Sequence, residues 1–400
     1  MDTYTLRAIT ETDLPGSAAL MAQAFLLDHR AEEFQAMLGP ILGSGPATGA
    51  FDGDQIVGCL FVLNRTVCLP GTGLVPFGGV SSVAVAPDHR RRGLLTRIMR
   101  ATLTESSPAI SGLWASEAPI YGRFGFGQAT ETQDATIRSK APFRAGIDLG
   151  TDRVRELSRE RAWPLVHEIY DQYAATRVGM LGREEVNWEY HYHDSVAARR
   201  DASAYRFVIH PEGYAAFRVR GVWEDNGPAG KVSVHEFVAL TPQAHAALWR
   251  YLLDLDHAAE LTANLATDDL LPLILFDPRA TVRKTLHALH IRLTDVARAL
   301  PMRGYSAPVD VVIDVADEFC PWNAGKLRFT VSAGVATVER TTAAADLSTS
   351  STELGAAFLG GTRLTALAAA GRVQEHTAGA VAALSAAFLA EREPVCQEIF

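Results

Sequence analysis

The stretch SSVAVAPDHRRRGLLTRIM, residues 81–99, holds the residues whose types and spacing point most clearly to chemistry. Val83 and Val85 alternate as in a strand, and three arginines and Gly93 separate that strand from an apolar helical pattern. A helix N-terminus presents unpaired N–H groups and a partial positive charge, which together favour an anion. Arginines add charge-assisted hydrogen bonds to phosphate oxygens, and glycine lets a ligand approach the backbone. We predict that residues 90–95 bind a pyrophosphate; a solvated basic turn is the alternative.

The elements that would position this turn are predicted along the first 140 residues. TLRAIT is typical of a strand, and TDLPGSAALMAQAFLL of a helix capped by Thr12 or Asp13. AFDGDQIVGCLFVLNRTVCLPG predicts a hairpin with DGD at its turn, and ISGLWAS predicts a buried strand after the helix. The order β-α-β-β-β-α-β indicates a mixed α/β fold.

A chain of 400 residues exceeds a single hydrophobic core, so we expect more than one domain. VALTPQAHAALWRYLLDLD aligns with VAVAPDHRRRGLLTRIMRATL when Pro242 is matched to Pro87, and ELTANLAT follows at about the spacing of ISGLWAS. The second copy carries AAL where the first carries RRG. This indicates an internal repeat whose second copy lacks the two arginines and the glycine of the turn. A chance match of two strand–turn–helix units is the alternative.

The last hundred residues have a different pattern. PVDVVIDVAD, KLRFTVSAG and VATVERT alternate with period two and predict a small antiparallel sheet, and alanine-rich helical segments follow. We therefore expect three domains, over residues 1–145, 146–300 and 301–400.

Composition restricts the partners. The formal net charge is −9, from 37 basic and 46 acidic residues, which argues against a nucleic-acid surface and suits a cationic substrate. The N-terminal segment MDTYTLRAITETD lacks the basic and apolar regions of a signal peptide, and the longest apolar runs are too short to span a bilayer. We expect a cytoplasmic protein without a membrane span; export without a leader is the alternative.

Two patterns bear on metals and redox chemistry. The four cysteines form no CxxC pair, which indicates buried thiols in a reducing compartment. NWEYHYHDS contains a His-x-His pair, at His191 and His193, without a third distant ligand. We interpret it as an ordinary surface strand or turn, and we predict no metal.

The run V-x-V-x-P-x-x-R-R-R-G-L-L resembles the acetyl-CoA signature of the GNAT superfamily of N-acetyltransferases. The usual form Q/R-x-x-G-x-G/A is met by Arg90 and Gly93, whereas Leu95 replaces the final small residue, a departure expected in the Eis (enhanced intracellular survival) family. ASEAPIYGRFGFG, residues 115–127, resembles that family's motif around its catalytic tyrosine. The three-domain organisation and the final residue, Phe400, also resemble the Eis family. The resemblance implies an α/β (α+β) fold: two GNAT-like mixed-sheet domains, the second degenerate, followed by a small sterol-carrier-like α+β domain.

The same resemblance assigns the binding residues. The backbone of Val83, Ala84 and Val85 would hold the pantetheine arm, because this strand splays from its neighbour in GNAT folds. The pyrophosphate would contact six consecutive residues: Arg91, Arg92, Gly93, Leu94, Leu95 and Thr96. Ser116 and Glu117 would complete the cofactor contacts. Asp28, near the first helix, would bind the cationic acceptor, because this region walls the acceptor pocket.

By the same resemblance, Tyr121 and the α-carboxylate of Phe400 are the catalytic residues. Acetyl transfer needs a proton on the departing sulfur, and transfer from a tyrosine of pKa ~10 to a thiolate of pKa ~8.5 is uphill by only about 2 kcal/mol. A carboxylate of pKa ~3.5 is a weak base for an amine of pKa ~10, by roughly 9 kcal/mol. Either burial raises the carboxyl pKa, water relays the proton, or the amine is less basic than lysine. The alternatives are purely structural: Tyr121 would be a packing residue, and Phe400 would belong to a frayed chain end.

The resemblance implies an acetyl-CoA-dependent N-acetyltransferase acting on primary amines, with aminoglycosides as expected acceptors and acetylation at several amines of one molecule. The alternatives are protein lysines or other small amines as acceptors, or a non-catalytic carrier of an apolar ligand. The family also implies a homo-oligomer, a hexamer.

Overall fold

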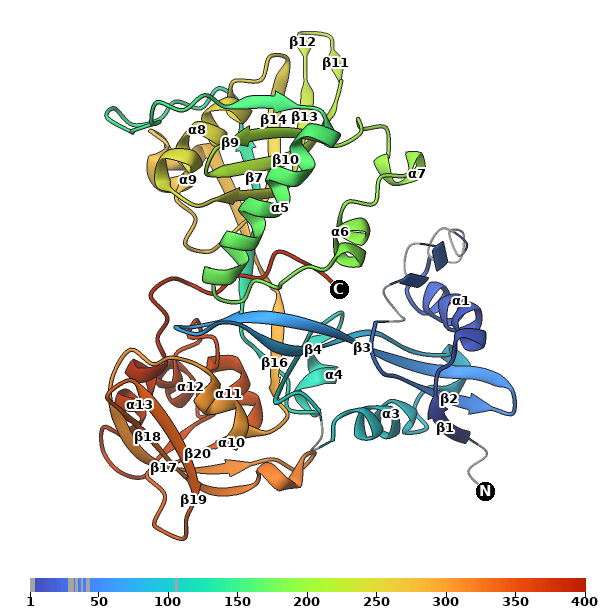
Figure 1. Cartoon of the computed structure of the whole chain (residues 1–400), viewed down its shortest axis with the longest axis vertical. Coiled ribbons are helices and arrows are strands. Elements are labelled where there is room, and N and C mark those ends of the chain that lie inside the picture. The colour runs from blue at the N-terminus through green and yellow to red at the C-terminus, as the bar shows by residue number, and fades with distance from the viewer. Residues whose placement is uncertain (1–3, 28–31, 33–34, 37–38, 41–43, 105–106) are drawn as a thin grey trace.

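The computed structural model describes residues 4–27, 32, 35–36, 39–40, 44–104 and 107–400. Within these ranges the chain forms two seven-stranded sheets and one five-stranded sheet, each with helices packed against it (Figure 1). A short two-stranded ribbon of β11 (Trp223–Glu224) and β12 (Gly227–Pro228) projects from the second part.

The first sheet contains the strands predicted around the arginine-rich turn. Its strand order is β1-β2-β3-β4-β5-β16-β6. The strands are β1 (Tyr4–Ala8), β2 (Ala47–Asp52), β3 (Gln55–Leu69), β4 (Gly73–Val85), β5 (Ile110–Trp114), β6 (Gly127–Gln128) and β16 (Leu289–Leu293). Its helices are α1 (Leu14–Ala24), α3 (Leu94–Thr102) and α4 (Ala118–Gly122). The DGD turn joins β2 to β3 as expected, with Gly53 at a positive φ. Asp13 precedes α1 as predicted, but its carboxylate binds Arg7 and Thr10 rather than the helix.

The second sheet repeats the plan of the first. Its order is β15-β7-β14-β13-β10-β9-β8. The strands are β7 (Glu131–Arg138), β8 (Arg155–Leu157), β9 (Arg206–His210), β10 (Gly213–Arg220), β13 (Gly230–Ala239), β14 (Ala258–Leu265) and β15 (Thr281–His287). The helices are α5 (Arg159–Thr176), α6 (Glu185–His191), α7 (Val196–Arg199), α8 (Pro242–Leu253) and α9 (Leu271–Ile274). The parallel pair β13–β14 joined by α8 matches the parallel pair β4–β5 joined by α3, so the internal repeat is present in the structure.

The two sheets exchange one strand each. β7 follows β6 in the chain yet pairs with β14 and β15 of the second sheet, while β16 returns to the first sheet between β5 and β6. Only two residues separate β6 from β7 and one separates β15 from β16, so each pair is a nearly continuous extended segment that passes between sheets. The segments bond where they cross, from Ala129 N to Leu289 O and from Ala288 N to Thr130 O. The expected domain boundary at 145/146 therefore leaves β7 in the first domain although it belongs to the second sheet. The boundary at 300/301 leaves β16 in the second domain although it belongs to the first sheet.

The third part consists of β17 (Val309–Ala316), β18 (Gly325–Ser332), β19 (Val335–Arg340), β20 (Leu347–Ser350) and β21 (Gln374–Glu375). Its helices are α11 (Ser351–Ala357), α12 (Leu364–Ala369) and α13 (Ala380–Phe388), and the short α10 (Val296–Ala299) precedes it. The three strands expected from period two form an antiparallel arrangement in which β18 pairs with both β17 and β19, and β20 adds to β17 in parallel. One hydrophobic core joins this sheet to Val67, Phe77 and β16 of the first sheet.

The histidine-rich segment differs from its sequence interpretation. It forms helix α6 rather than a surface strand or turn, because Trp188 and Tyr192 pack into an aromatic core. The four cysteines are all buried as free thiols. No helix in the described part of the chain is long and apolar enough to cross a membrane.

Candidate active site

β4 and β5 separate at the point where the sequence places the pantetheine arm. In the described ladder they pair only at Gly78–Ser111 and Gly79–Gly112, although β4 continues to Val85. A bulge lies just beyond, because two residues of β4, Ser82 and Val83, oppose one residue of β3. Ser82 adopts a φ of 54°, which is consistent with the bulge. The edge of β4 that faces β5 along Val83–Val85 is therefore open to a ligand's amide groups.

The arginine-rich turn leads into α3 with its backbone exposed. Arg91 and Gly93 both have positive φ, 60° and 76°, on either side of Arg92. Such alternation turns successive N–H groups toward one side, an arrangement that binds anions. A Cβ at Gly93 would meet nothing within 4 Å, so the glycine is required by its φ, and the space beside it is open.

Arg91 and Arg92, two of the three arginines of this turn, are held differently. The Arg92 guanidinium donates to the Tyr4 hydroxyl at 2.7 Å and to the Asp88 carbonyl at 3.1 Å. Arg91 has no hydrogen-bond or ion-pair partner among the described residues and is exposed. The turn thus combines one anchored cation with one that is free to meet a phosphate.

Tyr121 lies in the short helix α4 directly after β5. Its side chain is buried, 6% exposed, and packs edge-on against Phe126 with ring centroids 6.2 Å apart. Burial raises the pKa of Tyr121, and a hydrogen bond with Ser116 partly offsets this. The phenol therefore keeps its proton through neutral pH, as a general acid must.

A cavity of about 310 Å³ joins the groups that the sequence assigns to catalysis. It is lined by Phe25, Val80–Val83, Leu113–Ser116, Tyr121, Ile399 and Phe400. It opens between the separated ends of β4 and β5. The structure thus brings Tyr121, Ser116, Val83 and Phe400 together, although Phe400 is 279 positions beyond Tyr121 in the chain.

The remaining predicted residues lie around this cavity rather than in its wall. Ala84 and Val85 continue β4 beyond it, and residues 91–96 lie at the start of α3. Glu117 is exposed at the start of α4. Asp28 lies outside the described residues.

Phe400 reaches the cavity at the end of an extended tail that follows α13. Figure 1 shows this red segment passing between the first and second sheets to end near α6. The Phe400 ring packs edge-on against Phe77, 6.0 Å between centroids, and lies over Gly79 of β4. A Cβ at Gly79 would lie 3.0 Å from a ring carbon, so the ring occupies the space that a side chain there would fill.

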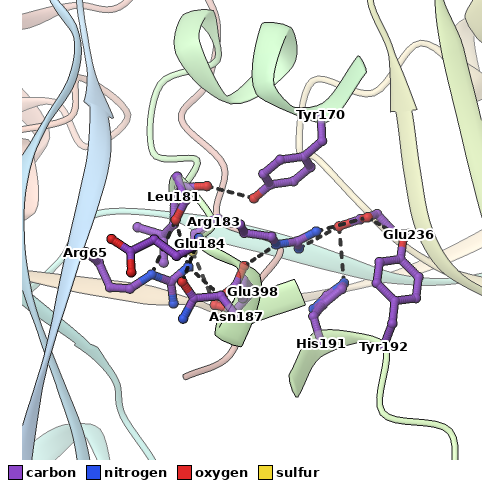
Figure 2. Close-up of polar contacts among 12 residues, drawn as sticks. Arg65, Tyr170, Leu181, Arg183, Glu184, Asn187, His191, Tyr192, Glu236 and Glu398 are labelled. Carbon is purple, nitrogen blue, oxygen red and sulfur yellow. Dashed lines mark hydrogen bonds and ion pairs between the residues drawn. The ribbon is translucent and has the colours of Figure 1, made fainter. Parts of the chain in front are cut away.

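A buried chain of charges holds this tail, and sequence reasoning missed it (Figure 2). Glu398 is 2% exposed and accepts hydrogen bonds from Arg65 and Arg183, each at 2.6 Å. Arg183 also donates to Glu236, whose carboxylate accepts from Tyr192 and Tyr214 and lies 3.2 Å from His191. Burial alone would raise the pKa of Glu398, but Arg183 and Arg65 hold it below its ordinary value. Each buried carboxylate therefore stays ionised between basic partners.

The comparisons with known proteins agree with this geometry. Family models described as acetyltransferase (GNAT) domains match residues 5–129 and 179–296, and a sterol carrier protein domain matches 296–397. The chain is 39% identical to an uncharacterized N-acetyltransferase of Streptomyces avermitilis, over 85% of this chain and 86% of that one. It is 32% identical to the N-acetyltransferase Eis of Mycobacterium bovis, over 97% of this chain and 98% of that one. The chain belongs to the Eis family of N-acetyltransferases.

A solved structure supports the same assignment. Eis1 from Mycobacterium abscessus, 30% identical, superposes with a TM-score of 0.86 over 99% of this chain and 100% of its own. The expected fold of two GNAT-like domains and a sterol-carrier-like domain is confirmed. This member of the Eis family is accordingly an acetyltransferase.

Proposed function

We propose that this Eis-family enzyme transfers the acetyl group of acetyl-CoA to primary amines of cationic acceptors, aminoglycosides in the first instance. The observation that carries the proposal is the cavity in which Tyr121, Phe400 and the open edge of β4 meet. It lies between two strands whose separation exposes backbone groups, next to a turn built for an anion.

Acetyl-CoA fits the residues present. The open edge of Val83–Val85 offers N–H and C=O groups to the pantetheine amides. The exposed turn Arg91–Gly93 and the first N–H groups of α3, which begins at Leu94, offer donors to the pyrophosphate. Arg91 supplies a cation to the same phosphates. Ser116 and Glu117 follow β5 and border the thioester end of this path.

The chain's own groups supply both proton transfers. Tyr121, kept neutral by burial, donates a proton to the departing sulfur. The carboxylate of Phe400, a residue that lines the same cavity, accepts the proton that the amine loses. A carboxylate is a weak base for an amine, so we place a water between the two, in line with the polar Ser81, Ser82 and Ser116 of the lining.

The acceptor should be a cation. The net charge of −9 attracts polyamines over distance, and the described residues that line the cavity include no lysine or arginine. We extend the proposal to acetylation at several amines of one aminoglycoside, with Asp28 as the acceptor-binding carboxylate.

Mass spectrometry of a multi-amine aminoglycoside incubated with protein and acetyl-CoA tests the proposal. Products heavier by two or more acetyl groups support it in full, and a single acetyl supports the enzyme without multi-site transfer. Thermal melting with and without acetyl-CoA is the companion measurement, since ligand at a thousandfold excess over Kd should add about 4 kcal/mol to the free energy of unfolding. If acetyl-CoA binds but no aminoglycoside product forms, the acceptor would instead be a protein lysine or another small amine. If acetyl-CoA does not bind and no product forms, the proposal is overturned.

We also propose a homo-oligomer, a hexamer as in the family resemblance. Support comes from β15, an edge strand of the second sheet on which Val282 is 70% exposed, and from the nearby chain positions Leu273 and Phe276, each 68% exposed. Light scattering at several protein concentrations measures the mass directly; a monomer at all concentrations would refute the assembly.

A further inference from the structure

The tail that carries Phe400 has one strong attachment close to its end. Val395 N bonds to Val178 O, and Arg392 pairs with Asp268 on the surface, its side chain 54% exposed. Ile399 lines the cavity and is 63% exposed. Between these lies Glu398, the buried carboxylate that both Arg65 and Arg183 bind. Its position, two residues before Phe400, makes it the last fixed point of the tail.

The two arginines come from different parts of the molecule. Arg65 belongs to β3 of the first sheet, and Arg183 precedes α6 of the second part. Arg183 is itself held by Glu236 and lies over the rings of Tyr170 and Trp188, 4.0 and 4.6 Å from their centroids. Figure 2 shows both guanidinium groups converging on Glu398. Neither cation can follow the tail if it moves, so the attachment point is rigid.

We propose that Glu398 is a positioning residue of the active site: Arg65 and Arg183 clamp its carboxylate and thereby fix Phe400 in the wall of the cavity beside Tyr121. The inference rests on the role proposed above for Phe400. Two residues of extended chain span at most about 7 Å, so fixing Glu398 confines Phe400 to the neighbourhood of the cavity. Without the clamp, the buried Val395 and Cys396 would still hold the start of this segment, and beyond them the described contacts of Phe400 are those of its ring with Phe77 and Gly79.

The clamp also explains why the site needs three domains. The third domain supplies the tail, the second supplies Arg183, and the first supplies Arg65 and the cavity. An enzyme in which any of these contacts is lost would keep its acetyl-CoA-binding strand and turn, since neither involves the tail. We therefore expect the clamp to affect turnover and not cofactor binding.

The test compares two variants of the full-length chain. In Arg65→Gln/Glu398→Gln both partners become neutral, so the clamp is lost while Arg183 and Glu236 still balance each other in the interior. Arg392→Gln is the matched control, because it removes the tail's exposed ion pair and leaves the clamp. Melting by near-ultraviolet circular dichroism verifies that both variants are folded.

Hydrogen–deuterium exchange over residues 395–400 and steady-state kinetics are the two readouts. We expect the double variant to exchange at least tenfold faster in this peptide and to lose roughly 10- to 100-fold in kcat, with the KM for acetyl-CoA within twofold. Arg392→Gln should match the parent enzyme in the exchange rate of residues 395–400 and in kcat. In a chain ending at Ile399, the double substitution should change kcat less than twofold, since nothing remains to be positioned.

Each contrary result has a definite meaning. Unchanged exchange in the double variant would overturn the clamp, whatever the activity. Faster exchange with unchanged kcat would leave the clamp in place but refute the role proposed for Phe400. An equal loss of kcat with and without Phe400 would show that the ion pairs support the fold only, and it would overturn the positioning role.

Discussion

Gly79→Ala tests the active-site geometry without touching any polar group. Gly79 lies in β4 with an ordinary extended backbone, so alanine is tolerated there by conformation. The added Cβ would lie 3.0 and 3.1 Å from two carbons of the Phe400 ring, whereas carbon atoms pack best at about 3.5–4.0 Å. Its third neighbour, the Leu63 Cβ at 3.5 Å, is at ordinary contact distance. The methyl group must therefore displace the Phe400 ring by a few tenths of an ångström, up to roughly 0.5 Å.

The displacement predicts a large kinetic effect and a small effect on stability. A misplacement of about 1 Å in a reacting group costs on the order of 100-fold in rate, so for this smaller shift we expect a loss of roughly 10-fold in kcat. Overpacking a closed core costs about 1–3 kcal/mol, but Phe400 ends the chain and can move, so we expect a loss of less than about 1 kcal/mol in the free energy of unfolding. The assay is kcat for acetyl transfer at saturating acetyl-CoA, with urea denaturation of the same preparation.

Gly221→Ala is the control for this prediction. A Cβ added at Gly221 would meet no atom within 4 Å, and the residue has no positive φ and lies in the second part of the chain, away from the cavity. This variant should match the parent in both assays. A folded Gly79→Ala enzyme with the parent's kcat would refute the argument that the place of Phe400 matters for turnover.

Three further outcomes follow from the same geometry. Tyr121→Phe should lower kcat by about 100- to 1,000-fold, because it removes the acid but keeps the ring, while isothermal titration shows acetyl-CoA affinity within twofold. Gly93→Ala should cost about 1 kcal/mol by urea denaturation and raise the KM for acetyl-CoA, since φ is 76° there and no neighbour is close. The pKa values of Glu398 and Glu236 lie below the ordinary 4.5, so both bind protons more readily in the unfolded chain. Their stabilisation is present above about pH 4.5 and is lost as pH falls through the lower folded pKa values; melting temperature should drop in that range, less steeply for Glu398→Gln.

Local signals made much of the site predictable. The positive φ of Gly93, the turn at Gly53 and the strand before Pro87 depend on neighbours in the chain, so residue type and spacing identify them. The repeat of strand, proline and helix at Pro242 was visible for the same reason. Tyr121 needed more than local pattern, because an isolated tyrosine in an aromatic turn is indistinguishable from a packing residue; its assignment came from the motif around it.

Long-range pairing could not be predicted. Glu398 lies 333 positions from Arg65 and 215 from Arg183, and nothing in the spacing of a single sequence connects them. The one available signal was a single charged side chain, Glu398, in the mostly apolar final stretch VCQEIF; a buried carboxylate there needs a partner. Likewise, the period-two pattern of a strand states which face is buried but not which sheet it joins.

The exchange of β7 and β16 has a physical basis in their burial. Every residue of β16 is buried, because the sheet continues on either side of it and α11 packs against one face: a Cβ at Gly355 of α11 would lie 2.3 Å from Ile291 O. β7 instead alternates buried and exposed residues, with Glu131 and Arg138 exposed at its ends. Placing β7 between β5 and β6 would bury those charges beneath α11 without partners, which is strongly unfavourable. The second part of the chain therefore contributes to the first sheet a strand that the first part does not contain, and it does so while lacking the arginine–glycine turn itself. The second part thus supplies β16 to the first sheet and Arg183 to the attachment of the tail.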